Sequence, residues 1–123
     1  MHRELGPGLL ESAYQAGMVH ELGRRGIGFE RQRQIPVNYK GVRLDCGYRV
    51  DLLVEGEVIV ELKAIDALHP IHTAQVLSYL KLAGLQVGLL INFNVLLLKD
   101  GIRRVVLGLA RVGEPAGGSA VPG

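Results

Sequence analysis

The sequence has a single cysteine and no long uninterrupted apolar run, and both absences exclude whole classes of protein. Cys46 has no partner in the chain, which excludes an internal disulfide and fits a reducing, cytoplasmic compartment. The first residues show no apolar secretory segment. The most apolar stretch, residues 87–98, is interrupted by Asn92 and Asn94 and is shorter than the roughly 20 residues that a membrane-spanning helix needs. We therefore expect this stretch to lie in a core and not in a membrane.

The sequence also lacks a large excess of positive or negative charge, because 14 Lys and Arg residues against 12 Asp and Glu residues give a formal net charge of only +2. This value is too small to indicate nucleic-acid binding by itself. The sequence lacks a G-x-x-x-x-G-K-[ST] loop, a G-x-G-x-x-G turn and a convincing Ser/His/Asp arrangement, which leaves P-loop hydrolysis and triad catalysis without support. We predict one domain over residues 1–112 and a disordered tail over residues 113–123, which are rich in Gly and Pro.

Apolar spacing, glycines and prolines predict an α/β domain. Apolar residues recur at helical spacing over residues 9–24, and two glycines end this first helix. Pro70 at a first helical turn and Gly84 beyond the last turn predict a second helix over residues 70–83. The remaining apolar segments predict strands at residues 29–39, 42–54, 58–64 and 86–91 and from residue 95 onward, with a turn at Asp100 and Gly101 before residues 102–107. The predicted order is α-β-β-β-α-β-β.

Two acidic residues and a lysine lie on the neighbouring predicted strands 42–54 and 58–64. Side chains two residues apart on a strand point to the same face, so Glu61 and Lys63 share a face. On the preceding strand, Asp51 is expected on the face opposite to that of Val50, Leu52 and Val54.

The turn between these strands decides whether the carboxylates meet. A three-residue turn, 55–57, pairs Val54 with Val58. Counting back along both strands, Asp51 then lies directly opposite Glu61 on one face. A two-residue turn would separate the two carboxylates. The glycine at the centre of the turn suits a three-residue loop, which commonly needs glycine in the left-handed conformation, so we favour the first register.

Opposed carboxylates need a compensating partner, because like charges are destabilising and the burial of ionised groups is costly. A hard divalent ion would supply this compensation, and oxygen-only ligands favour Mg²⁺ or Mn²⁺ over Zn²⁺. Lys63 beside the pair would orient a water or neutralise charge in the transition state. The alternative is a salt-bridge ladder on a solvent-facing side of the sheet, made of Arg49, Asp51, Glu61 and Lys63. The residues alone weight these two interpretations almost equally.

The motifs, in their order along the chain, resemble a known family. An aspartate, a hairpin and Glu-Leu-Lys on a strand form the core pattern of the PD-(D/E)XK nuclease superfamily. Gln75 and Tyr79 add the Q-x-x-x-Y pattern of RecB-like and CRISPR-associated nucleases, and this spacing places both side chains on one helical face. Upstream, the segment GLLESAY resembles the motif that names the GxxExxY protein family of that superfamily, through Gly8, Glu11 and Tyr14.

The resemblance covers residues 2–107 and is specific as a combination. Neither E-x-K nor Q-x-x-x-Y is specific alone, but HRELGPGLLESAY, VELKA and AQVLSYL occur here in the family's order. The chain departs from the family at one place. Relatives carry an extra helical stretch before HRELGPG, whereas here Met1 directly precedes it, so we expect the first helix to lack a packing partner.

The resemblance implies a restriction-endonuclease-like core, in which a mixed β-sheet is flanked by helices. It implies that Asp51, Glu61, the backbone carbonyl of Leu62 and Glu11 are ligands of Mg²⁺ or Mn²⁺. It also implies that Lys63 is the catalytic lysine.

Three further side chains have both a functional and a purely structural interpretation. Glu11 would complete the site, and its place on an apolar helical stripe with Tyr14, Met18 and Leu22 needs a reason. The alternative is a partly exposed glutamate stabilised by the helix dipole. Gln75 and Tyr79 would brace the lysine or contact a phosphate, and the alternative is a tyrosine packed on the core.

The predicted function is metal-dependent hydrolysis of nucleic-acid phosphodiester bonds, with DNA favoured over RNA as the partner. The alternative is a catalytically inactive nucleic-acid- or protein-binding module with the same fold. A third interpretation is a homodimer that uses the apolar late strands, which is compatible with catalysis. His69 and His72 are either additional metal ligands or caps of the second helix. The basic residues would contact phosphates if the fold gathers them on one side, or else form a solvated surface: Arg24, Arg25, Arg31, Arg33, Lys40, Arg43, Arg103 and Arg104.

Overall fold

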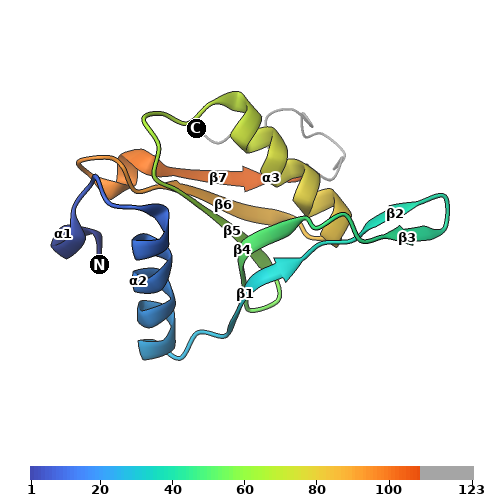
Figure 1. The fold of residues 1–123 in the computed structure, drawn as a ribbon, viewed down its shortest axis with the longest axis horizontal. Coiled ribbons are helices and arrows are strands. Elements are labelled where there is room, and N and C mark those ends of the chain that lie inside the picture. The colour runs from blue at the N-terminus through green and yellow to red at the C-terminus, as the bar shows by residue number, and fades with distance from the viewer. Residues whose placement is uncertain (109–123) are drawn as a thin grey trace.

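A five-stranded mixed sheet with helices on both faces forms the body of the molecule in the computed structural model, which describes residues 1–108 (Figure 1). The strands lie in the order β1-β4-β5-β6-β7. Only the central pair, β5 and β6, is parallel. The strands of this sheet are β1 (Phe29–Gln34), β4 (Arg49–Val54), β5 (Val58–Lys63), β6 (Val87–Asn92) and β7 (Ile102–Val106).

Two helices cover the sheet, one on each face. Helix α3 (Pro70–Ala83) connects the parallel strands β5 and β6, as a parallel pair requires. Its core with the sheet includes Ile59, Val76, Leu80, Leu90 and Val105. Helix α2 (Glu11–Arg24) packs on the opposite face, in a core that includes Tyr14, Leu52, Val60, Leu62 and Phe93. The elements of the main sheet and its two helices follow each other as α-β-β-β-α-β-β, so the predicted fold class and order are confirmed.

The local signals at the second helix and at the central hairpin are confirmed in detail. Helix α3 has Pro70 as its first residue and ends before Gly84, which has a left-handed φ of 70°. In the hairpin between β4 and β5, Val54 pairs with Val58, as the three-residue turn requires. Gly56 has a φ of 67° in that turn, a conformation that favours glycine.

Two predicted strands are wrong in length, because each is split in two. Residues 29–39 form β1 and, beyond Pro36, the separate strand β2 (Val37–Tyr39). Residues 42–54 form β3 (Val42–Leu44) and β4, with residues 45–48 between them. Strands β2 and β3 pair only with each other and extend from the body on the side opposite α1 and α2 (Figure 1). Pro36 has no backbone N–H to donate, which is consistent with the interruption of the ladder there.

The chain ends show further differences from the prediction. A short helix, α1 (His2–Leu5), was not predicted, and α2 begins at Glu11 and not at residue 9. The strand expected from residue 95 onward is wrong, since bends and the 3₁₀ helix η1 (Leu98–Gly101) lead into β7. The boundary of the predicted domain at residue 112 and the predicted tail lie outside the described residues. Within residues 1–108, no helix is both long enough and apolar enough to cross a membrane.

Candidate active site

One end of the sheet collects the predicted site residues. Asp51 lies near the start of β4, and Glu61 and Lys63 lie at the end of β5. Because β4 and β5 are antiparallel, the start of one strand lies beside the end of the other. The chain enters α3 seven residues after the end of β5, so the N-terminus of this helix is close in sequence to the same end of the sheet.

The Asp51 and Glu61 carboxylates replace the backbone acceptors where the β4–β5 ladder ends. The last paired residues are Leu52 and Val60. Beyond them, the Asp51 N–H donates to Glu61 Oε1 at 3.1 Å, and the Leu62 N–H donates to Asp51 Oδ2 at 2.7 Å. Each carboxylate is therefore held by the backbone of the other residue's strand. This crossed pair brings the two predicted ligands together.

The alternation of faces breaks at Asp51. Val50 packs in the core on the α3 side, whereas Leu52 packs in the core on the α2 side, so the expectation that they share a face is wrong. Gln32 on β1 lies opposite Asp51 on β4, but the two residues are not paired, whereas the residues on both sides of them are. Gln32 has a φ of 48°. A non-glycine residue with this φ distorts an extended strand, and the distortion interrupts the two-residue alternation.

The Glu61 carboxyl group is buried, which is unfavourable for its ionised form. Its side chain is only 6% exposed. Burial, followed by the negative charge of Asp51, raises the pKa of Glu61 to about 8, and the backbone hydrogen bond from Asp51 and the charge of Lys63 oppose this shift. Glu61 therefore carries a proton over much of the neutral pH range when no cation is bound.

Lys63 contributes positive charge to the site without forming a close ion pair. It is half-buried at the end of β5. Its charge lowers the pKa of both Glu61 and Glu11, which places it near both carboxyl groups. The four ion pairs within 4 Å among residues 1–108 include neither Lys63 nor Arg49. The solvent-facing salt-bridge ladder is therefore not formed, and Glu61 is buried at this end of the sheet.

Glu11 stands at the exposed start of α2, where a structured loop delivers it. Partial desolvation and then the charge of Asp51 raise the pKa of Glu11. The loop before it contains Gly8, with a φ of 93°. Buried Tyr14 holds this loop, because its hydroxyl donates to the Gly6 carbonyl and accepts the Leu9 N–H at 3.1 Å. Gly8 thus supplies a turn and Tyr14 an anchor for the loop that precedes Glu11.

Gln75 and Tyr79 are brought together on α3. The Gln75 side-chain amide donates to the Tyr79 hydroxyl at 3.1 Å. Tyr79 is 8% exposed and belongs to the core, so the structural interpretation of its ring is confirmed. Burial and then the charge of Glu61 raise the pKa of the Tyr79 hydroxyl, which places the hydroxyl near the carboxylate pair. The side chain therefore serves the core with its ring while its oxygen borders the site.

His69 and His72 act as helix caps in this structure. The His69 N–H donates to His72 Nδ1 at 2.9 Å, and His69 is the N-cap of α3. Burial, followed by the charges of Lys63 and His69, lowers the pKa of His72. Among residues 1–108, no group of three or more His, Cys, Asp or Glu side chains is arranged to hold a metal ion, so the structure gathers neither the two histidines nor Glu11 with the carboxylate pair into such a site.

Asn92 is a positioning residue that the sequence did not reveal. It is 2% exposed and lies at the end of β6, paired in register with Lys63. Its side-chain oxygen accepts the Ile65 N–H at 3.1 Å, and its side-chain nitrogen donates to the Ile65 carbonyl at 2.9 Å. The Phe93 N–H also donates to the Lys63 carbonyl at 2.9 Å. The segment that follows Lys63 is thereby fixed to the end of β6.

Replacement of Asn92 by alanine is expected to lower the free energy of unfolding by about 2–4 kcal/mol, because the Ile65 N–H loses its buried acceptor and the Ile65 carbonyl keeps only the longer bond from Asn94, at 3.3 Å. Urea denaturation measures this change. The matched control is Asn38→Ala at an exposed strand position, which should stay within about 0.5 kcal/mol of the parent. Equal stability of Asn92→Ala and Asn38→Ala would show that the Asn92 clamp contributes nothing.

The donor set fits a hard divalent cation. Asp51 and Glu61 offer two adjacent carboxyl groups, and burial followed by the charge of Asp51 raises the pKa of Glu61, an effect that a bound cation would oppose. Mg²⁺ is usually held by one or two carboxylates, with waters and substrate phosphates in the other positions, so a third protein carboxylate is not required. The pair is also rich in oxygen and free of thiolate, which favours Mg²⁺ or Mn²⁺ over softer ions.

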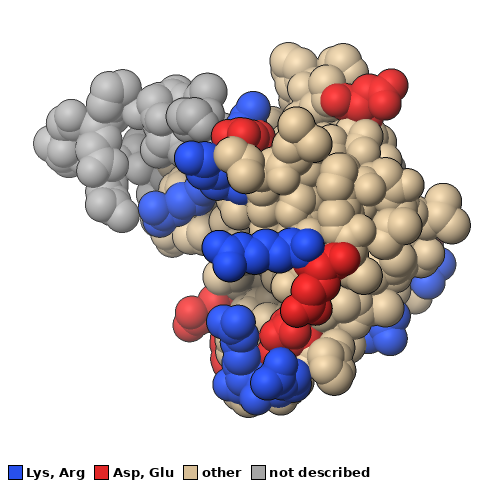
Figure 2. Space-filling view, turned by 90° about the vertical axis from the view of Figure 1, so that its left-hand side faces the viewer, with Lys and Arg blue, Asp and Glu red and all other residues tan. Residues whose placement is uncertain are grey.

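The surface around the site is not uniformly basic. On the face that carries α1 and α2, acidic and basic side chains are interspersed (Figure 2). Arg24 and Arg25 both face Glu21, at 3.9 and 3.8 Å. The Glu21 carboxylate thus offsets part of the positive charge of these two arginines.

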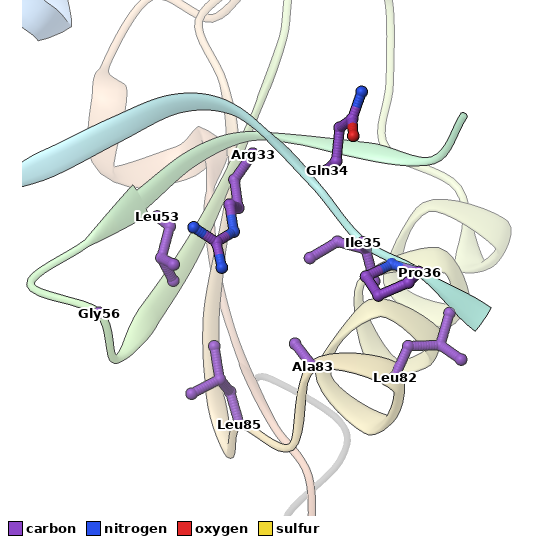
Figure 3. Close-up of a pocket in the computed structure, with 9 residues that line it drawn as sticks. All are labelled: Arg33, Gln34, Ile35, Pro36, Leu53, Gly56, Leu82, Ala83 and Leu85. Carbon is purple, nitrogen blue, oxygen red and sulfur yellow. The ribbon is translucent and has the colours of Figure 1, made fainter. Parts of the chain in front are cut away.

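A pocket of about 290 Å³ lies apart from these residues, between β1, the β4–β5 turn and the end of α3. Figure 3 shows Arg33 extending into it between Leu53 and Ile35. Gly56 and Leu85 belong to its wall and mark the end of the sheet opposite Glu61 and Lys63. No predicted site residue lines this pocket, so it is not part of the candidate active site.

The comparison with protein families agrees with this arrangement. The family model described as the PD-(D/E)XK nuclease superfamily matches residues 1–105, which include both helices and all but the end of the described sheet. No curated protein and no solved structure matches the chain. The match extends over most of the 123 residues and contains the carboxylate pair and its lysine. The chain belongs to the PD-(D/E)XK nuclease superfamily.

Proposed function

We propose that this protein is a divalent-metal-dependent nuclease that hydrolyses phosphodiester bonds of nucleic acid, with DNA favoured over RNA as the substrate class. The observation that carries the proposal is the crossed pair of Asp51 and Glu61, set side by side where the β4–β5 ladder ends, with Lys63 two residues after Glu61. Membership of the superfamily supports a nucleic-acid substrate, and nucleases of this superfamily generally use divalent metal ions. Cleavage and metal dependence are the parts that we add.

Each residue of the site has a defined task in this proposal. Asp51, Glu61 and the backbone carbonyl of Leu62 would hold Mg²⁺ or Mn²⁺, and Glu11 would add a carboxylate from α2. When bound, such an ion supplies Lewis-acid polarisation of the scissile phosphate and makes a nearby water more acidic. Lys63 places an ammonium group beside the reacting phosphate, where it orients the water or stabilises developing negative charge.

Gln75 and Tyr79 take a supporting role. The Gln75 amide orients the Tyr79 hydroxyl, which borders the carboxylate pair and can donate to a phosphate oxygen. The inactive binding module remains the alternative, since it would keep this fold and need not bind a metal. The assignment to the GxxExxY group and the formation of a homodimer stay predictions.

Calorimetric titration with Mn²⁺ tests the metal site. The parent is expected to show saturable binding, and Asp51→Asn is expected to lose it, because the variant removes one of two adjacent anionic ligands. The matched control is Asp45→Asn, which removes an exposed aspartate paired with Arg43 and should bind like the parent. Equal binding by Asp51→Asn and the parent would place the metal elsewhere.

The Mn²⁺ affinity of the parent is expected to depend on pH. Burial and then the charge of Asp51 raise the pKa of metal-free Glu61 to about 8, with Lys63 and Tyr79 as its other charged or titratable neighbours. An ion that binds this carboxylate below its pKa must displace a proton, so affinity should rise about tenfold per pH unit below about pH 8 and level off above it. Titrations on both sides of this pKa measure the slope. An affinity that does not change with pH would contradict a role for Glu61 as a ligand.

A further inference from the structure

The two-stranded extension of the β1–β4 hairpin has an unusual surface. We define the arm as residues 35–48, which contain β2 and β3. Its two strands pair with each other and with nothing else in the described chain. Tyr39 lies opposite Val42, and Val37 lies opposite Leu44, so these side chains share one face of the ribbon. The exposed fractions on this face are 57% for Tyr39, 57% for Val42 and 39% for Leu44.

An exposed apolar ribbon face indicates a binding surface. An isolated two-stranded hairpin is only marginally stable in water, and it does not gain stability from apolar side chains that remain exposed. The shape of the arm is nevertheless well specified, because Lys40 and Gly41 form its tip with φ values of 48° and 79°. The Lys40 ammonium lies 5.4 Å from the centre of the Tyr39 ring. A defined ribbon thus presents an aromatic ring and a cation together.

Charge around the arm favours an anionic partner. Residues 29–49 contain five basic and two acidic residues, whereas the whole chain has 14 basic and 12 acidic residues. Glu30 and Asp45 neutralise only Arg33 and Arg43 within ion-pair distance. The other basic residues of the segment, Arg31, Lys40 and Arg49, form no ion pair within the described part of the chain.

The arm is continuous with the candidate active site. The Ile35 N–H donates to the Tyr48 carbonyl at 2.8 Å, which joins the arm to the main sheet beside the start of β4. The Tyr48 ring lies 6.2 Å from the Tyr79 ring, centre to centre. Burial and then the charge of Glu61 raise the pKa of Tyr79, with smaller contributions from Tyr48 and Asp51. The pair of Tyr48 and Tyr79 therefore lies between the base of the arm and the carboxylate pair.

We propose that the arm is a binding element for single-stranded nucleic acid, which stacks a base on Tyr39 and leads the strand past Tyr48 to the carboxylate pair. Flat unpaired bases match the apolar ribbon face, and phosphates match the basic residues beside it, which is the combination found in single-strand binding surfaces. A duplex keeps its base faces stacked inside and offers nothing apolar of this shape to the ring. The inference rests on the proposed function for its substrate class, but binding by the arm does not require catalysis.

Fluorescence anisotropy with short labelled oligonucleotides tests this inference, with excess chelator present so that no metal-dependent cleavage occurs. The parent is expected to bind single-stranded DNA or RNA more tightly than a duplex. Tyr39→Ala is expected to weaken single-strand binding roughly 5- to 150-fold, the range that loss of one base–aromatic stack produces. The matched control is Leu96→Ala, which removes an 87% exposed apolar side chain from the loop after β6 and should leave the affinity unchanged.

A second pair of variants tests the charge of the arm. Lys40→Asn keeps a residue that tolerates a positive φ, and it should reduce the slope of log affinity against log salt concentration by about 0.7, the value for one lost phosphate contact on a single strand. Lys99→Asn removes an exposed lysine from η1 and should leave the slope unchanged.

The outcomes separate this inference from the proposed function. Loss of affinity in Tyr39→Ala but not in Leu96→Ala supports the arm, whether or not the parent cleaves anything. Equal affinity of Tyr39→Ala and the parent, or binding of duplex alone, overturns it even if cleavage is observed. A change from dimer to monomer in Tyr39→Ala with unchanged nucleic-acid affinity also overturns it, because the ribbon face would then be an interface between copies of this chain.

Discussion

The Lys63→Ala variant is expected to cleave nucleic acid roughly 100- to 10,000-fold more slowly than the parent, the range over which a positioned proton-transfer or charge-stabilising group contributes. The reason is its place in the site. Lys63 follows Glu61 by two residues on β5, and its charge acts on Glu61 and Glu11. Removal of the ammonium leaves the carboxylate pair intact, so the variant should retain Mn²⁺ binding, and single-turnover cleavage with Mn²⁺ measures the loss.

The control for this variant is Lys99→Ala, which removes an exposed lysine from η1 at a position outside the site. It should cleave like the parent, and both variants should unfold at urea concentrations close to that of the parent. A Lys63→Ala variant that folds, binds Mn²⁺ and cleaves at the parental rate would remove the lysine from the mechanism.

The Glu61→Gln variant is expected to lose metal binding and yet become more stable than the metal-free parent at alkaline pH. A carboxyl group whose pKa is raised on folding stabilises the fold below its ordinary pKa of 4.5, and this contribution is lost as pH rises through about 8. The metal-free parent should therefore lose up to about 5 kcal/mol of stability across this range. Glutamine resembles the protonated acid, keeps an oxygen for the Asp51 N–H, and has no such loss.

Urea denaturation in chelator at acid and alkaline pH measures this difference, and Mn²⁺ titration measures the lost site. The control is Glu57→Gln in the turn between the same strands, where the side chain is exposed and the substitution should change neither quantity. If Glu61→Gln is less stable than the parent at alkaline pH, the buried carboxylate is not the unfavourable group that we describe.

The parts of the fold that depend on local rules could be predicted from the sequence. The pairing of Val54 with Val58 follows from the length of one turn, and it brings Asp51 and Glu61 together by counting alone. Helix α3 follows from Pro70 and Gly84 at its ends. These signals act over a few residues, so no knowledge of the rest of the chain is needed.

The parts that were missed depend on contacts between distant residues. Residues 29–39 and 42–54 were each predicted as one long strand because their β propensity is continuous. The arm is separate from the main sheet because β2 and β3 pair only with each other, which the sequence does not reveal. The residues after 95 read as a strand because they are apolar, but the chain leaves β6 where Asn92 uses its amide to bind Ile65, 27 positions away. The same long separation hid the positioning role of Asn92.

Tyr14 and Tyr79 are motif residues whose contacts could not be predicted from their spacing in the sequence. Tyr14 was expected on an apolar stripe, and it does lie in the core, but its hydroxyl also fixes the loop that precedes Glu11. Tyr79 was expected to brace the lysine or contact a phosphate, or else to pack on the core; its ring packs on the core, and its hydroxyl accepts a hydrogen bond from Gln75. Sequence spacing places such residues on a helical face, whereas their partners are set by tertiary packing.

Cleavage of labelled single- and double-stranded DNA and RNA by the parent, with Mg²⁺ or Mn²⁺ and with a chelator control, is the deciding measurement for the proposed nuclease activity. We expect cutting that requires the divalent ion and that is lost in Lys63→Ala protein purified in the same way. No cutting of any of these substrates by folded parent protein that binds Mn²⁺ would contradict the proposed nuclease activity and favour a binding module with a nuclease fold.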